Sequence, residues 1–202
     1  MSLPSPPPDL PASPPLHKLG PGDKLVRFYD PARGGWDQRR DYGPLPELRF
    51  DHHLPPLGGS RDRSVWYGAT SLVGAVAEAF GNRGRLDKGA RRRICVVRVR
   101  SPLLLINLVG VAARTFGLDQ RIGTVLEYTV CQEWARALYE RYASSHGLRW
   151  RGRQAGSLCV ALNDRADMGS FELIADYPIS HPKVWNQVAG AARRARLRIV
   201  GP

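Results

Sequence analysis

Short runs of apolar, β-branched and aromatic residues recur along the chain between turn-forming residues, a pattern typical of strands. The first run, at residues 25–29, stops at Asp30-Pro31, and glycine and proline then punctuate a loop over residues 31–47. The pattern predicts strands at residues 25–29, 63–69, 94–100, 103–109, 157–162 and 172–177.

Apolar residues at spacings of three and four predict helices at residues 72–81, 124–143 and 184–197. Thr70-Ser71 supplies an N-cap for the first helix, which ends at Gly81, and Gly147 ends the second. The third helix has a basic C-terminal end, which suits the helix dipole. Strands clustered before and after a long helix, without regular alternation, indicate an α+β fold with a mixed sheet in a single domain.

Eight of the first 21 residues are proline, which has no backbone N–H for a helix or a sheet. We therefore expect residues 1–22 to form a proline-rich flexible tail and residues 23–202 to form the folded domain. A polyproline ligand for a partner is the alternative role for this segment.

A chain of 202 residues fits one domain, which buries roughly 70% of its unfolded surface and needs neither disulfides nor metals. Its three cysteines are widely spaced and odd in number, which fits a reducing compartment. No apolar run is long enough to span a membrane, and the N-terminus lacks the features of a signal peptide. The expectation is a soluble cytoplasmic protein that does not bind membranes.

The net charge is +12, and 26 of the 30 basic residues are arginine. Such a field attracts nucleic acid, an acidic protein or a phosphate-bearing small molecule, although GC-rich codons produce the same arginine excess. The arginines cluster at residues 83–85, 91–93 and 193–196. Because such clusters are usually solvated and residues 83–93 contain no aromatic residue, we expect no direct nucleic-acid partner.

The sequence motifs of common nucleotide-binding proteins, hydrolases and metalloproteases are absent from the chain. His52 and His53 are adjacent, and neighbours on a strand point to opposite faces, so one metal ion could hardly use both. We predict no metal site.

Three residues remain as candidates for chemistry. Glu78 falls opposite the apolar face of the first helix, with Gly74 one turn before it on the same side. It is either a solvated glutamate or the carboxylate of a cleft in which Gly74 leaves room for a ligand. Tyr67 is either a half-buried strand aromatic or a stacking platform for a flat heterocycle. Arg27 lies in an apolar strand and points either outward or into a phosphate pocket.

Together these segments resemble the RES domain, the toxin half of bacterial RES–Xre toxin–antitoxin pairs. The resemblance runs from about Lys24 to Ile179, and the interval of 11 residues between Tyr67 and Glu78 is the family's. It rests on Leu25-Val26-Arg27, Arg49-Phe50-Asp51, Val65 to Thr70, Ala75 to Glu78, Thr129, Trp134-Ala135, Gly147 to Trp150 and Cys159 to Leu162.

The resemblance implies a fold related to ADP-ribosyltransferases and an enzyme that cleaves the nicotinamide–ribose bond of NAD+, with phosphate or water as acceptor. It implies that Arg27 holds an anionic part of NAD+, that Tyr67 packs on the base or ribose, and that Glu78 orients the ribose and stabilises an oxocarbenium-like transition state. Arg49 is expected at the pyrophosphate or the incoming phosphate. The implied partner is a DNA-binding antitoxin of the Xre type, in an oligomeric complex.

One position departs from the family. Gly152 stands where the resemblance places the family's serine, and Ser157, five residues on, is the candidate substitute. A glycine has no hydroxyl, so the missing hydrogen bond comes from Arg153, Ser157 or water, or is absent. A catalytically impaired relative that still binds its antitoxin is therefore the first alternative, and a basic nucleic-acid-binding protein is the second.

Overall fold

The computed structural model describes residues 3–40, 48–53, 63–153 and 155–201. Within them the strands are β1 (Leu16–Leu19), β2 (Lys24–Tyr29), β3 (Trp66–Ala69), β4 (Arg85–Asp87), β5 (Arg93–Val99), β6 (Leu103–Asn107), β7 (Gly147–Arg151), β8 (Leu158–Leu162), β9 (Phe171–Pro178) and β10 (Arg198–Val200). The α-helices are α1 (Leu72–Phe80), α2 (Val111–Arg114), α3 (Tyr128–Arg141) and α4 (Pro182–Arg194).

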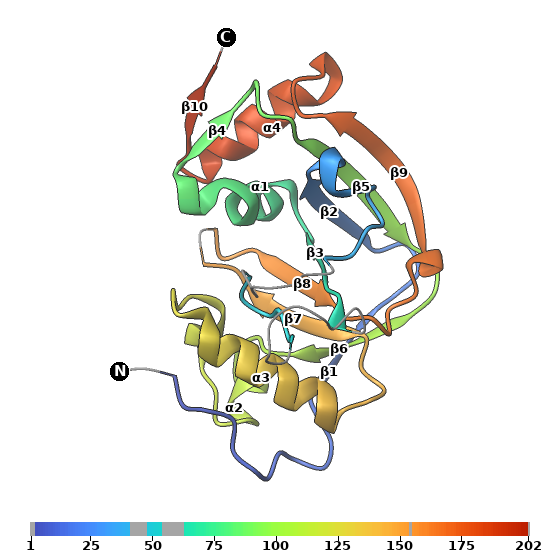
Figure 1. Cartoon of the computed structure of the whole chain (residues 1–202), viewed down its shortest axis with the longest axis vertical. Coiled ribbons are helices and arrows are strands. Elements are labelled where there is room, and N and C mark those ends of the chain that lie inside the picture. The colour runs from blue at the N-terminus through green and yellow to red at the C-terminus, as the bar shows by residue number, and fades with distance from the viewer. Residues whose placement is uncertain (1–2, 41–47, 54–62, 154, 202) are drawn as a thin grey trace.

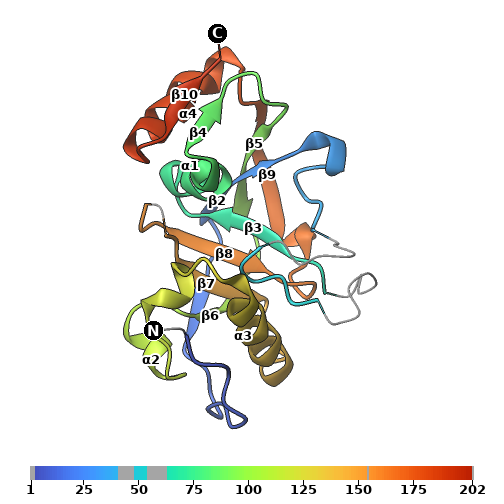
Figure 2. The same cartoon turned by 60° about the vertical axis from the view of Figure 1, so that its left-hand side comes forward.

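Eight strands form one curved sheet in the order β1-β6-β7-β8-β3-β2-β5-β9. The β6–β7 pair is parallel and the other pairs are antiparallel, so the sheet is mixed. Strands β4 and β10 form a separate parallel pair. Figures 1 and 2 show α1 and α4 near one end of the molecule, beside β4 and β10, and α3 near the other end. The predicted α+β class with a mixed sheet is confirmed.

Both faces of the large sheet are buried. Because side chains alternate along a strand, Val26 of β2 joins the core under the helices, whereas Leu25 and Tyr29 join a second core on the opposite face. The three cysteines are buried free thiols.

Helix α1 begins where the sequence predicts. The Ser71 hydroxyl accepts a hydrogen bond from the Gly74 amide, the usual way in which a serine cap satisfies a free N–H of the first turn. The helix buries Val76 and Phe80 and ends at Phe80, one residue before the predicted boundary. This local geometry places Glu78 on the last turn, away from the buried face.

The predicted flexible tail is wrong for residues 3–19. Leu3 is buried, Leu16–Leu19 pair with β6, and two prolines contact α3 or the residue that follows it. The Pro4 carbonyl accepts from Trp134 Nε1 at 2.8 Å, and the Pro11 carbonyl accepts from the Tyr142 hydroxyl at 2.7 Å. Proline lacks only the backbone donor, and its carbonyl remains available to donors on the domain.

Further differences concern element bounds: the helix predicted at residues 184–197 spans Pro182–Arg194, and the strand predicted at residues 103–109 spans Leu103–Asn107. The helix predicted at residues 124–143 is shorter and spans Tyr128–Arg141, and a separate 3₁₀ helix at Gln120–Gly123 precedes it. Gly147 starts β7 instead of ending that helix, and a side chain there would lie 2.1 Å from the Ala161 carbonyl oxygen of β8. Part of the predicted loop, residues 41–47, lies outside the described residues.

Candidate active site

A cavity of about 260 Å³ lies where strands of the large sheet meet α1 and the start of α3. Its walls come from β2, β3, α1, the start of α3, β7 and the start of β8. Arg27, Arg49, Tyr67 and Glu78, four of the five predicted site residues, all line it, and Ser157 does not. Residues far apart in sequence therefore meet where the sequence analysis expects a ligand.

Glu78 reaches the cavity from the last turn of α1. Although the residue as a whole is exposed, its carboxylate packs over Gly152, where a Cβ would lie 2.3 Å from Oε1. Burial raises the pKa of Glu78, and the nearby Arg49 guanidinium and a hydrogen bond from the Arg153 backbone amide oppose that rise. The carboxylate is thus oriented by a backbone donor in a positively charged environment.

Tyr67 is held at both ends of its side chain. Its hydroxyl donates to Asp51 Oδ1 at 2.8 Å and accepts from the Phe50 amide at 3.1 Å. Its ring meets the Trp150 ring nearly at right angles, with centroids 6.3 Å apart. Burial, followed by the Asp51 carboxylate, raises the pKa of Tyr67 well above its ordinary value. Tyr67 therefore presents a fixed neutral ring to the cavity.

Asp51 is a residue to which the sequence analysis assigned no role. It is fully buried, and Oδ2 accepts from the Leu48 amide at 2.9 Å while Arg40 Nη2 lies 4.0 Å from the same oxygen. It lies in Arg49-Phe50-Asp51, one of the segments that carry the family resemblance. The motif marked the position, but only the fold shows that this carboxylate anchors Tyr67.

Arg49 lies at the end of the cavity where α3 begins. Its Nη1 donates to the Val125 carbonyl at 2.7 Å and to the Ile122 carbonyl at 3.3 Å. Its guanidinium carbon lies 4.9 Å from the centre of the Tyr128 ring, a cation–π arrangement. These contacts fix a cation in the wall of the cavity that contains Glu78.

Arg27 lines the cavity but has other partners. Its guanidinium donates to the carbonyls of Trp36 at 3.3 Å and Gln38 at 2.8 Å, and it lies over the Trp66 ring at 5.1 Å. Burial lowers the pKa of Arg27 to about 10. Strand alternation explains the placement, because Arg27 shares a face of β2 with Leu25 and Tyr29.

The structure separates Ser157 from the cavity. Its hydroxyl lies 3.4 Å from that of Ser71 at the start of α1, and its side chain fills the space beside Gly74. The alternative in which Gly74 leaves room for a ligand is therefore wrong, because the small residue admits Ser157 instead.

Apart from Arg153, which the sequence analysis named as a candidate hydrogen-bond donor, the other lining residues were not proposed as functional from the sequence. Trp150 and Tyr128 add aromatic surface, and Arg40, Arg92 and Arg153 add positive charge. Of these, only Trp150 stands in a segment that carries the family resemblance. The arginines gave no local signal, because they stand among 26 in the chain.

The described residues show neither a metal-binding cluster nor a membrane-spanning helix. They contain no group of three or more His, Cys, Asp or Glu side chains placed to hold a metal ion. None of their helices combines the length and the apolar character needed to cross a membrane.

Comparison with known proteins shows to which family the chain belongs. No curated protein matches the chain. The chain is similar in fold to a solved structure described as the M. tuberculosis MbcT–MbcA toxin–antitoxin complex, with a TM-score of 0.57 and 15% sequence identity over 85% of this chain and 92% of that one. The RES domain family matches residues 24–182, most of the chain, and so the protein belongs to the RES domain family.

Proposed function

We propose that this chain is the toxin of a toxin–antitoxin pair and that it degrades NAD+ at the nicotinamide–ribose bond. One observation carries the proposal: Glu78, Tyr67 and Arg49, from three separate segments, line the same cavity. Membership of the RES domain family and the similar fold of a toxin solved with its antitoxin support it.

The reaction suits the residues present. When the C1′–N bond breaks, its electron pair goes to the nicotinamide nitrogen, so neutral nicotinamide leaves without being protonated. The ribosyl carbon keeps a positive charge, which a fixed carboxylate stabilises. Among the described residues that line the cavity, Glu78 is the only acid. We therefore assign Glu78 to the ribose.

The acceptor completes the reaction. An oxygen of water or phosphate bonds to C1′, and water loses its proton to solvent. Positive charge in the wall suits both the pyrophosphate of NAD+ and an incoming phosphate. We assign Arg49 to this charge, because it lowers the pKa of Glu78 more than any other charged group does. The Arg27 guanidinium lies on the face of β2 opposite the helices and donates to the Trp36 and Gln38 carbonyls, so we assign the phosphate contact to Arg49 and not to Arg27.

The aromatic residues provide the surface for a flat ring. Tyr67, Tyr128 and Trp150 all line the cavity. Its volume of about 260 Å³ lies just under the range of about 300–1,000 Å³ usual for small-molecule sites. The cavity therefore suits the nicotinamide–ribose part of NAD+ better than the whole dinucleotide.

The glycine at position 152 bears on the alternative of an impaired relative. The Arg153 amide, next to Gly152, donates to Glu78. A backbone donor thus stands where the family's serine hydroxyl is missing. This observation favours an active enzyme over a relative that only binds its antitoxin. We propose that the antitoxin of this chain is a DNA-binding protein of the Xre type.

The test is to incubate the purified protein with NAD+, with and without phosphate, and to measure nicotinamide. Wild type should release it, and Glu78→Ala should lower the rate by about 10²-fold or more, the usual loss when one preorganised electrostatic contact is removed. Glu133→Ala on α3, which is outside the cavity and changes the net charge equally, should keep the wild-type rate. Absence of nicotinamide release by concentrated wild type under both conditions would remove the catalytic claim.

A further inference from the structure

Two arginine clusters that are far apart in sequence become one surface in the fold. Strands β4 and β10 pair in parallel with Arg85 opposite Arg198, and the Arg198 amide donates to the Gly84 carbonyl at 3.0 Å. This pairing joins the segment after α1 to the segment after α4. The resulting arginine cluster consists of Arg83, Arg85, Arg193, Arg194, Arg196 and Arg198.

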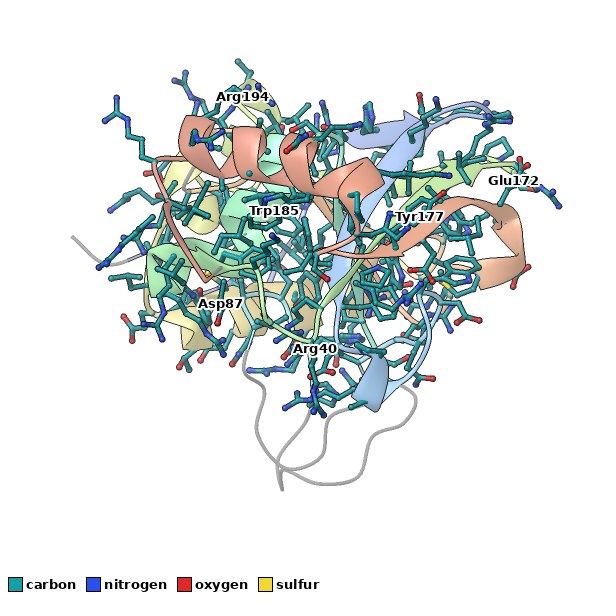
Figure 3. All side chains as sticks on the ribbon, turned by 90° about the horizontal axis from the view of Figure 1, so that it is seen from above. Arg40, Asp87, Glu172, Tyr177, Trp185 and Arg194 are labelled. Carbon is teal, nitrogen blue, oxygen red and sulfur yellow. The ribbon has the colours of Figure 1, made fainter. Side chains whose placement is uncertain are left out.

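The arginine cluster is exposed and not neutralised by neighbours. All six residues are exposed. Within the described part of the chain, no ion pair within 4.0 Å involves any of them. The nearby Asp87 carboxylate accepts from the Gly89 amide. Figure 1 places β4, β10 and α4 together near the C-terminus, and Figure 3 shows Arg194 near the C-terminal end of α4.

The third arginine run does not belong to this surface. Arg92 lines the cavity, and Arg93 Nε donates to Asp176 Oδ1 at 2.9 Å. The arginines at residues 83–85 and 193–198 therefore become neighbours and have no carboxylate partner among the described residues, whereas Arg93 has one.

Folding alone does not account for this arrangement. Like charges directly opposite each other destabilise a strand pair, and Arg85 faces Arg198. Arg196 has φ of 59°, a left-handed conformation that usually belongs to glycine after a helix. The dipole of α4 favours Arg193 and Arg194 at its C-terminus but does not explain the cations on the two strands.

The composition of the cluster identifies the partner. Interfaces between proteins centre on apolar and aromatic residues, whereas nucleic-acid interfaces are more polar and much more positively charged. None of the exposed large hydrophobic residues among those described lies in the cluster. Arginine forks bind phosphate oxygens in pairs. The sequence alone led us to expect no direct nucleic-acid partner, but the fold brings two of the arginine runs together. We propose that the arginine cluster binds the phosphate backbone of double-stranded DNA without reading its base sequence.

The test measures how salt affects DNA binding by the full chain. A labelled 20-bp duplex is titrated by fluorescence anisotropy over a NaCl series, where each neutralised phosphate adds about 0.9 to the slope of log K against log[salt]. Replacing Arg85 and Arg198 together by glutamine should lower the magnitude of that slope by about 2 and weaken binding about 10-fold or more at low salt. A double Arg114→Gln, Arg141→Gln variant removes the same charge from exposed positions on α2 and α3 and should bind like wild type.

Three results would overturn the proposal. They are no salt-dependent binding by wild type, an equal loss in both double variants, or binding of polyglutamate in preference to DNA, which would identify an acidic protein as the partner. The melting temperature of the Arg85, Arg198 variant should equal or exceed that of wild type, because a like-charge pair is removed. Nicotinamide release should be the same in both double variants, so the DNA result stands apart from the NAD+ proposal.

Discussion

Replacing Gly152 by alanine tests whether the position of Glu78 matters more for activity than for stability. The new Cβ would lie 2.3 Å from Glu78 Oε1 and 3.0 Å from Cys159 Sγ. Ordinary van der Waals contact begins near 3.4 Å, so the carboxylate must withdraw by about 1 Å. Gly152 does not have a positive φ, so alanine adds no backbone strain.

The magnitudes separate the two effects. Overpacking a rigid core costs about 1–3 kcal/mol, but here the group that moves is the end of a flexible side chain on an exposed helix turn. We expect a stability loss of about 1 kcal/mol or less, or roughly 2–4 °C in melting temperature for a chain of this size. A displacement of about 1 Å in a catalytic group lowers turnover about 10²-fold. Activity should therefore fall far more than stability.

The assay combines nicotinamide release at saturating NAD+ with thermal unfolding followed by circular dichroism. Gly190→Ala on α4 is the matched control, because a Cβ there meets nothing within 4 Å. It should keep full activity and gain up to about 1 kcal/mol of stability, since alanine suits a helix better than glycine. Wild-type turnover in Gly152→Ala would refute the reasoning, as would a large loss of stability with turnover per folded molecule unchanged.

Three further predictions concern stability and pH. Tyr67→Phe removes the phenol that donates to buried Asp51 and should lower the free energy of unfolding in urea by about 2 kcal/mol; an unchanged value would contradict that bond. Gly147→Ala brings a Cβ 2.1 Å from the Ala161 carbonyl, which belongs to rigid backbone, so the loss should be at least about 1–3 kcal/mol, and an unchanged melting temperature would count against it. Burial raises the pKa of Glu78, so the folded state binds that proton more tightly than the unfolded chain, and the stability this carboxyl contributes is lost as pH rises. Glu78→Gln should therefore have a higher melting temperature than wild type at pH 7 but not at pH of about 3, where an ordinary glutamate is already protonated. When the pH is lowered, wild-type turnover should begin to fall at a higher pH than the pKa of an unperturbed glutamate predicts. Equal melting temperatures at pH 7 would show that burial does not shift this carboxyl.

The elements that the sequence predicted well depend on local interactions. The start of α1 requires a serine cap and apolar residues at helical spacing, and both lie within a few residues of each other. Strand β2 ends at Asp30-Pro31 for an equally local reason, because proline cannot continue the ladder. Such signals do not depend on the rest of the fold.

The elements that the sequence analysis missed depend on distant partners. Strands β1, β4, β7 and β10 are three to five residues long and show no strong pattern of their own. Each becomes a strand because another segment offers it a ladder, as β6 does for β1 and β4 does for β10. The assumed flexibility of the proline-rich arm failed for the same reason, because its acceptors find donors only on the folded domain.

By itself, the order of residues determined the α+β class and the choice of Tyr67 and Glu78, because capping, periodicity and the spacing of a family's motif are all encoded along the chain. Only the tertiary structure decided what surrounds them: Asp51 at the Tyr67 hydroxyl, the Arg153 amide at Glu78, and carbonyl partners for Arg27. It also brought Arg85 opposite Arg198. Hydrogen bonds and charge interactions act over a few ångströms in space, and closeness in space between distant segments exists only once the sheet and helices have packed.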